Sequence, residues 1–286
     1  MAQAEIIQAV GPNAKQGLGA TDRSDNWRLG PIVTALGFGA FIVYSTARAI
    51  AGCPYFEAQT YFYGIDTPQL AETHAHFLSP FYSPLMTGLI PQSLAWISPA
   101  FLILWAPGGF RVTCYYYRKA YYRAFFMDPP ACAVGEPGSL CGIKRGMDYK
   151  GETRLLLFQN LHRYFMYFAL IFLVLLAIDV VFACIWPGEN GKEFGISVGT
   201  LVLAANVFCL SMYSFSCHSL RHLIGGRINC FSRIAFGQQR YKIWSIVSEL
   251  NKHHMFWAWT SLFMVGFADF YVWMVARGTF TDFRLF

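Results

Sequence analysis

Five apolar runs of about twenty residues constrain this chain more than any other feature. They cover about residues 31–52, 90–110, 161–186, 196–219 and 255–277. A hydrocarbon core of about 30 Å needs about 20 helical residues to cross it. The sequence therefore predicts an all-α integral membrane protein with five transmembrane helices. Pro91, Pro99 and Pro107 interrupt the second run, which packing against neighbouring helices can accommodate.

The apolar runs define the predicted domain organisation. We expect one five-helix membrane domain over residues 31–286, preceded by a polar cytoplasmic tail over residues 1–30 that contains no signal peptide. Only 13% of the residues are charged, about half of what soluble domains carry. No phosphate-binding loop or hydrolase motif is present. The net charge of +6 arises in the loops, so it indicates topology and not nucleic-acid binding.

The distribution of Lys and Arg predicts the orientation. Residues 111–154 contain eight basic residues and the loop before the fifth run contains six, whereas residues 53–91 contain none. Basic loops stay in the cytoplasm. The N-terminus and both basic loops are therefore expected inside, and the C-terminus outside.

The first basic loop opens with RVTCYYYRKAYYRAFF, residues 111–126. This stretch has no acid and interleaves bases with aromatic rings, which is typical of an interfacial helix that meets anionic lipid. A docking surface for an acidic soluble partner has the same composition, and both interpretations stay open.

Thiols and imidazoles gather at the inner ends of the predicted helices, and both side chains bind redox metals. The candidate ligands are Cys114, His162, Cys217, His218 and His222. One interpretation is a Rieske-type [2Fe–2S] centre with two Cys and two His ligands. A second is haem b between His162 and either His222 or His254. A third is that these histidines only cap helix ends or bind lipid phosphate.

The same edge has the chemistry of a quinone pocket, which needs a flat apolar slot, donors for two carbonyls and a source of protons. The candidates are Tyr115, Tyr116, Arg118, His162 and Arg163. Arg118 or Arg163 would polarise a carbonyl, and a tyrosine or His162 would supply a proton.

Two carboxylates fall inside predicted spans, Asp179 and Asp269. Ionisable groups at this depth are costly and mark proton paths or polar ligands. The alternative is a carboxyl group that is neutral or bonded to a hydroxyl on another helix.

Several unusual strings resemble one family. They are WAPGGFRVTCYYYRKAYYRAFF, DPPACAVGEP, QNLHRYF, CHSLRHLIGG and KHHMFWAW. From about Leu78 to Phe286 the chain is similar to the cytochrome b-like membrane-anchor subunit of a bacterial succinate dehydrogenase or fumarate reductase. The closest kind is the five-helix anchor of mycobacteria.

The resemblance implies a function that the residues alone do not specify. The chain would anchor a flavoprotein subunit and an iron–sulfur subunit in the bacterial inner membrane, in contact with lipid. It would pass electrons from succinate oxidation to menaquinone or ubiquinone, joining the tricarboxylic acid cycle to the respiratory chain, without acting on succinate itself. The mycobacterial kind implies a Rieske-type [2Fe–2S] centre in place of haem b, and a homotrimer of the whole complex is compatible with it.

Three alternatives remain open at this point. One is a small ion- or proton-coupled transporter that uses Asp179 and Asp269 as its polar path. Another is a structural anchor without cofactor. The third moves the redox centre to the outer face, where Cys53, His74 and His76 would be the ligands.

Overall fold

The computed structural model describes residues 19–51, 78–84, 98–127, 129–132, 134–135, 158–188, 191–226, 228–276 and 278–286. The helices in this part are α2 (Leu29–Ala51), α4 (Pro99–Thr113), α5 (Tyr115–Ala124), α6 (Phe158–Phe182), α7 (Val198–Phe215), α8 (His218–Gly225), α9 (Gly237–Asn251) and α10 (His254–Ala276). By compactness the chain divides into two units, one formed by Met1–Ala40 and Tyr115–Thr153, the other by Phe41–Cys114 and Arg154–Phe286.

Four helices in the described part are long and apolar enough to cross a membrane: α2, α6, α7 and α10. A fifth apolar helix, α4, is shorter, and the residues before Ser98 that would extend the second predicted run lie outside the described part. The protein is therefore helical and membrane-spanning, as predicted.

The bounds of one predicted span need a correction. The third predicted span, 161–186, ends early, because α6 stops at Phe182. An antiparallel hairpin follows, with β1 (Ile185–Gly188) paired to β2 (Gly191–Phe194). Pro187 has no N–H to continue a helix, so the apolar run passes into a strand.

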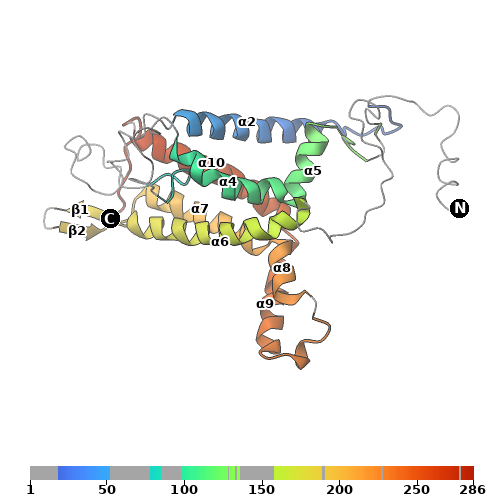
Figure 1. Ribbon diagram of the computed structural model, residues 1–286. Coiled ribbons are helices and arrows are strands. Elements are labelled where there is room, and N and C mark those ends of the chain that lie inside the picture. The colour runs from blue at the N-terminus through green and yellow to red at the C-terminus, as the bar shows by residue number, and fades with distance from the viewer. Residues whose placement is uncertain are drawn as a thin grey trace, which may run out of the picture. The chain divides into compact units, whose positions relative to one another are not determined.

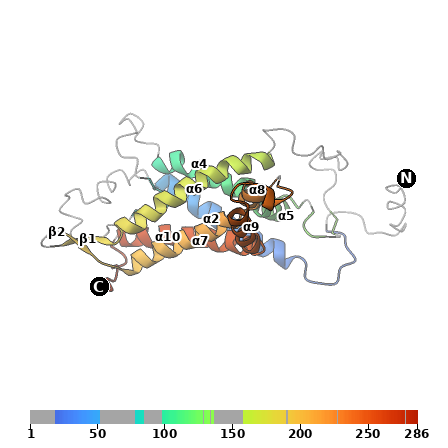
Figure 2. The same ribbon diagram turned by 90° about the horizontal axis from the view of Figure 1, so that it is seen from below.

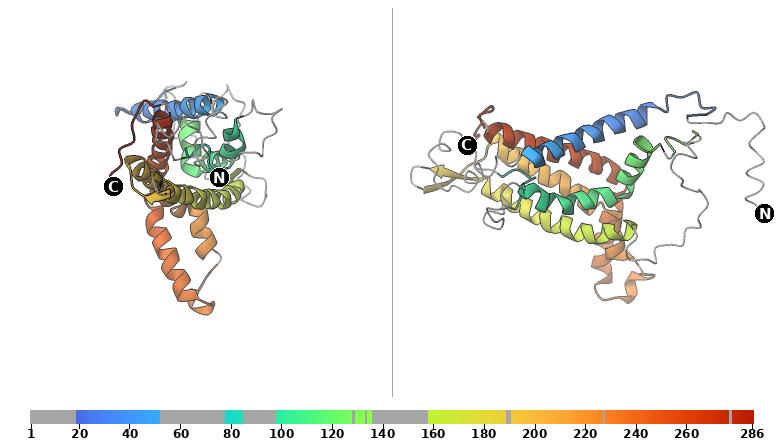
Figure 3. Two further views of the ribbon diagram at one scale, coloured as in Figure 1. Left: turned by 90° about the vertical axis from the view of Figure 1, so that its left-hand side faces the viewer. Right: turned by 45° about the horizontal axis from the view of Figure 1, so that its top comes forward.

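The second unit contains a bundle in which α4 lies beside α6, α6 beside α7, and α7 beside α10 (Figures 1 and 2). The hairpin β1–β2 lies at one end of this bundle. At the other end α8 and α9 project sideways as a helical arm (Figures 1 and 3). Arg221 on α8 ties the arm together, since it donates to Ser248 Oγ and lies over the Trp244 ring on α9.

The outward face of α6 is apolar. Ile171, Val174, Ile178 and Val181 are all exposed, and their spacing of three to four residues places them on one face. In water such a stripe would be costly, whereas in lipid it is the expected solvent-facing surface. α7 begins cleanly because Ser197 and Thr200 form a capping box.

A polar network lies inside the bundle at the hairpin end. Asp269 on α10 is fully buried and accepts hydrogen bonds from Arg48 Nε (2.7 Å), Tyr44 Oη (2.5 Å) and Ser79 Oγ (2.5 Å). The Arg48 guanidinium also lies over the Trp273 ring, 4.5 Å from its centroid. This network brings α2 and the segment at Ser79 onto α10.

The other intramembrane acid is also bonded to a hydroxyl. Asp179 is buried and accepts a hydrogen bond from Ser83 Oγ at 2.5 Å. Both carboxylates are thus bonded to hydroxyls. Only Tyr44 supplies its hydroxyl from another helix, as the alternative expected, whereas Ser79 and Ser83 lie in a non-helical segment.

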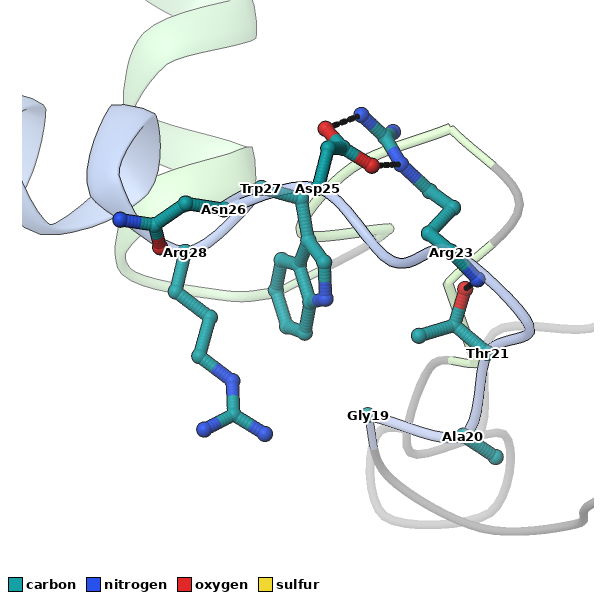
Figure 4. Close-up of a pocket in the computed structure, with 8 residues that line it drawn as sticks. All are labelled: Gly19, Ala20, Thr21, Arg23, Asp25, Asn26, Trp27 and Arg28. Atoms are coloured by element: carbon teal, nitrogen blue, oxygen red, sulfur yellow. Dashed lines mark hydrogen bonds and ion pairs between the residues drawn. The ribbon is translucent and has the colours of Figure 1, made fainter.

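The first unit is built from the N-terminal segment and α5. The ring of Tyr117 on α5 stacks on Phe38, with centroids 5.8 Å apart. Backbone hydrogen bonds join residues 19–20 to Gly135, and Arg23 donates to the carbonyl of Cys132. A hollow of about 460 Å³ is lined by residues between Gly19 and Arg28. Figure 4 shows these residues, among which Arg23 and Asp25 form an exposed ion pair.

Candidate metal centre

Two cysteines and two histidines meet at the arm end of the bundle. Cys114, His162, Cys217 and His254 are all buried. His162 Nε2 lies 3.2 Å from Cys217 Sγ, and His254 Nε2 lies 3.7 Å from Cys114 Sγ. The four residues, here called the Cys–His cluster, therefore form two thiol–imidazole pairs.

Helix ends position every member of the cluster. Cys114 directly follows α4, and Cys217 lies between α7 and α8; both have an extended backbone, with φ/ψ of −64°/136° and −65°/135°. His162 lies in the first turns of α6, and His254 is the first residue of α10. These extended residues interrupt the helices: Cys114 separates α4 from α5 along the chain, and Cys217 separates α7 from α8.

A hydroxyl holds the second nitrogen of each imidazole. Thr113 Oγ1 lies 2.9 Å from His162 Nδ1, and Ser216 Oγ lies 2.7 Å from His254 Nδ1. Asn251 Nδ2 donates to the Ser216 carbonyl at 2.7 Å. Both nitrogens of each ring thus have a partner.

Aromatic rings cover the two imidazoles. Phe110 stacks on His162 with centroids 4.7 Å apart, and Tyr213 stacks on His254 with centroids 5.0 Å apart. Phe110 and Tyr213 contact each other, with centroids 5.1 Å apart. The cluster is therefore closed by rings on its membrane side.

Burial raises the pKa of the Cys217 thiol to about 11, and the nearby Cys114 adds to this effect. The backbone N–H groups of Ser219 and Leu220, at the start of α8, act in the opposite direction because they favour the thiolate. At neutral pH Cys217 is therefore a thiol, and a metal would have to displace its proton.

The donor set distinguishes among metal groups. In the part of the chain that the structure describes, no three His, Cys, Asp or Glu side chains converge to hold a single ion. A [2Fe–2S] centre does not require such a point, because each iron takes two protein ligands. Haem would need two imidazoles that face each other across a wide gap. Here each Nε2 faces a sulfur and not the other imidazole. Two buried thiols and two buried imidazoles are the donor set of a Rieske-type centre, so the residues fit the iron–sulfur group better.

The structure brings together three of the five sequence-predicted metal ligands: Cys114, His162 and Cys217. His218 and His222 are exposed on α8 instead, and His222 Nδ1 lies 3.3 Å from Arg163 Nη2. The fourth position of the cluster belongs to His254, which the sequence had suggested only as a haem ligand. Cys53, His74 and His76 lie outside the described residues.

The quinone candidates fall in both units. In the first unit, Tyr115 contacts Tyr116 edge-on, and the Arg118 guanidinium lies 5.8 Å from the Tyr115 centroid. In the second unit, Arg163 is exposed, whereas His162 is buried within the Cys–His cluster.

Comparison with known proteins gives two matches. The sequence profile of the actinobacterial succinate dehydrogenase subunit SdhC family matches residues 29–278. The solved structure of the Mycobacterium smegmatis Sdh1 complex in the apo form contains a chain 39% identical to this one, with a TM-score of 0.74. The match covers 96% of this chain and 98% of that chain. No curated protein sequence matches.

Proposed function

Because the chain belongs to the actinobacterial succinate dehydrogenase subunit SdhC family, we propose that its Cys–His cluster holds the redox centre through which electrons reach quinone. The chain is the membrane-anchor subunit of a bacterial complex II, a multi-pass protein of the inner membrane.

One observation carries the proposal: two buried thiol–imidazole pairs meet where four helices end. Cys114, His162, Cys217 and His254 would hold a Rieske-type [2Fe–2S] group, which supplies one-electron transfer when bound. The protein residues exclude water, fix the imidazoles and provide the thiolates. Burial among apolar helices also sets the local dielectric, which tunes such a centre.

Partner subunits belong to the same proposal. The similar structure is an Sdh complex, which favours a flavoprotein and an iron–sulfur subunit as partners of this chain. We propose that they dock at the arm end of the bundle and that this end is cytoplasmic, because the arm lies in the basic segment between the last two spans and basic loops stay in the cytoplasm. In the first unit α5 carries Arg118, Lys119 and Arg123 and no acid, a composition that suits an acidic partner or anionic lipid. The second predicted span would complete five crossings through α4.

For the quinone, Arg163 is the proposed carbonyl donor in the second unit. Tyr115, Tyr116 and Arg118 remain the candidates of the first unit. His162 is a weaker candidate than the sequence suggested, because Thr113 and Cys217 already occupy both of its nitrogens.

The test compares two cysteines in the purified complex. Cys217→Ala should remove iron and acid-labile sulfide attributable to this subunit, and quinone reduction by succinate should fall to near background. Succinate oxidation with a soluble dye should persist, because the partner subunits are untouched. Cys209→Ala is the matched control, since Cys209 is a buried cysteine of α7 outside the cluster.

Two results would overturn the proposal. One is a wild-type complex whose iron and sulfide are fully accounted for by the partner subunits. The other is a Cys217→Ala complex that keeps both the full iron content and quinone reduction.

A further inference from the structure

One five-residue pattern occurs twice in the bundle, and both copies end at a cluster cysteine. The first copy is Phe-Arg-Val-Thr-Cys, residues 110–114, and the second is Tyr-Ser-Phe-Ser-Cys, residues 213–217. Each has an aromatic ring, two variable residues, a hydroxyl and a thiol. We call this the aromatic–hydroxyl–thiol motif. Each copy lies at the end of a long helix, and the φ and ψ angles of the two cysteines agree within 1°.

In each motif the first and the fourth residue contact one histidine. Phe110 stacks on His162 while Thr113 bonds its Nδ1. Tyr213 stacks on His254 while Ser216 bonds its Nδ1. Ring and hydroxyl are three residues apart, so they project from the same face of a helix. Together they fix both the plane and the rotation of the imidazole.

The thiol of each motif faces the histidine that the other motif contacts. Cys114 of the first motif faces His254, and Cys217 of the second faces His162. The two copies are therefore crossed: each holds one imidazole and offers its sulfur to the imidazole held by the other. The pairs α4–α6 and α7–α10 make equivalent contributions to one site.

The hydroxyl protons determine which imidazole nitrogen carries hydrogen. Thr113 Oγ1 donates to the Gly109 carbonyl at 2.7 Å, and Ser216 Oγ donates to the Tyr213 carbonyl at 3.1 Å. Since each hydroxyl has given its proton to the backbone, its oxygen is left to accept from Nδ1–H. Each imidazole is then protonated on Nδ1, and the lone pair of Nε2 points at a sulfur.

We propose that Thr113 and Ser216 are positioning residues that hold His162 and His254 in the tautomer and orientation needed for ligation through Nε2. The inference rests on the proposed iron–sulfur centre and adds to it the residues that preorganise the site. Outer hydrogen bonds of this kind raise ligand basicity, and their loss usually costs about 10- to 100-fold in metal affinity.

The experiment uses the whole complex with single substitutions. Thr113→Val and Ser216→Ala each remove one acceptor, and Thr113→Ser restores one. The matched control is Ser211→Ala, because the hydroxyl of Ser211 on α7 donates to the Val207 carbonyl and lies outside the cluster. Measured quantities are iron and sulfide content, the rate of iron loss to a chelator, the electron paramagnetic resonance spectrum and the midpoint potential of the anchor's centre.

Thr113→Val and Ser216→Ala should lose iron to the chelator about 10 to 100 times faster than wild type. Any centre that remains should have a higher midpoint potential, because a less basic imidazole stabilises oxidised iron less. Thr113→Ser and Ser211→Ala should resemble wild type.

The inference fails if wild type is loaded and both Thr113→Val and Ser216→Ala match it in chelator resistance, spectrum and potential. A wild-type complex without a centre in this subunit instead overturns the proposed function. Should one variant fail to assemble, the other variant decides, since the two hydroxyls lie on different helices.

Discussion

The two ends of the bundle hold polar residues in the membrane in opposite ways. At the hairpin end, Asp269 and Arg48 form a buried ion pair whose carboxylate accepts bonds from two hydroxyls as well. At the arm end, the Cys–His cluster consists of thiols and imidazoles that can all be neutral. α10 carries both Asp269 and His254, which are about 22 Å apart along the helix.

The difference lies in what remains available for a ligand. Both oxygens of Asp269 are engaged by strong, charge-assisted donors, so this carboxylate acts as a structural joint. In the cluster, by contrast, each sulfur lies against an imidazole nitrogen in a thiol–imidazole pair. A metal group that binds a thiol displaces its proton. The transporter alternative, which needed Asp179 and Asp269 as a polar path, gains no support from hydroxyl-bonded carboxylates.

Asp269→Ala should have the largest effect on stability. It leaves the Arg48 guanidinium buried without its counter-ion, which costs about 3–5 kcal/mol in comparable buried pairs. Thermal unfolding of the complex in detergent measures the loss. Iron content per folded complex should not change, because the cluster lies at the other end.

The double variant Arg48→Met with Asp269→Leu is the control. Replacing both charges with apolar groups should recover most of the stability. The contrast between the two ends of the bundle would be contradicted if Asp269→Ala is as stable as wild type, or if it loses iron while remaining folded.

Gly109→Ala should have a smaller effect, and it should lower both the stability of the complex and its retention of iron. A Cβ at this position would lie 2.2 Å from Phe165 Cε1, so α4 and α6 must separate or the ring must move. Overpacking of this kind costs about 1–3 kcal/mol. Because Thr113 and His162 lie on these two helices, the chelator should also remove iron faster.

Gly108→Ala is the matched substitution, since nothing lies within 4 Å of its added Cβ. It should leave both unfolding temperature and iron retention near wild type. Equal effects of the two alanines would show that α4–α6 contact does not control the cluster.

The smallest expected effect concerns the reactivity of a thiol within the arm, between α8 and α9. A hydrogen bond with Ser232 Oγ at 3.0 Å holds the pKa of the exposed Cys230 below its usual value. The thiolate is therefore more abundant at neutral pH, and its share falls as pH drops through the lowered pKa. Maleimide labelling at pH 7 should be severalfold slower in Ser232→Ala.

The same thiol reports which end of the bundle faces the cytoplasm. A membrane-impermeant maleimide should label Cys230 in inverted vesicles and not in right-side-out vesicles. The reverse pattern would contradict the proposed orientation of the arm end and the docking side with it.

Much of the fold could be predicted because lipid leaves few choices for the backbone. The runs at 196–219 and 255–277 correspond to α7 and α10, whose bounds differ from prediction by one to four residues. The ends were less predictable: hydropathy continues through Trp186, whereas the helix stops at Phe182 and a hairpin forms. The arm helix α9 was missed, since its exposed Tyr, Ile and Lys residues give no clear helical stripe.

For the site, the sequence singled out three of the four side chains that the structure brings together, Cys114, His162 and Cys217. It favoured His222 because four-residue spacing from His218 suggested one shared face. The helix break at Cys217 instead turns α8 away from the bundle, so these two imidazoles go with the arm. Thr113 and Ser216 were missed although their signal is local: a hydroxyl directly before a cysteine, at both helix ends.

The arm has a further property that follows from where the cluster residues flank it. Cys217 immediately precedes α8 and His254 begins α10. The segment between them therefore forms a loop-like projection whose two ends are both held at the cluster. The Ser216–His254 and Asn251–Ser216 hydrogen bonds already close this base. A bound centre would join Cys217 and His254 through the metal group, as a cross-link does. The tip of the arm near Phe236 would not be part of this cross-link. Because closure entropy rises only by about 0.6 kcal/mol for each doubling of a flexible loop, a change in the length of that tip should cost little stability at the base.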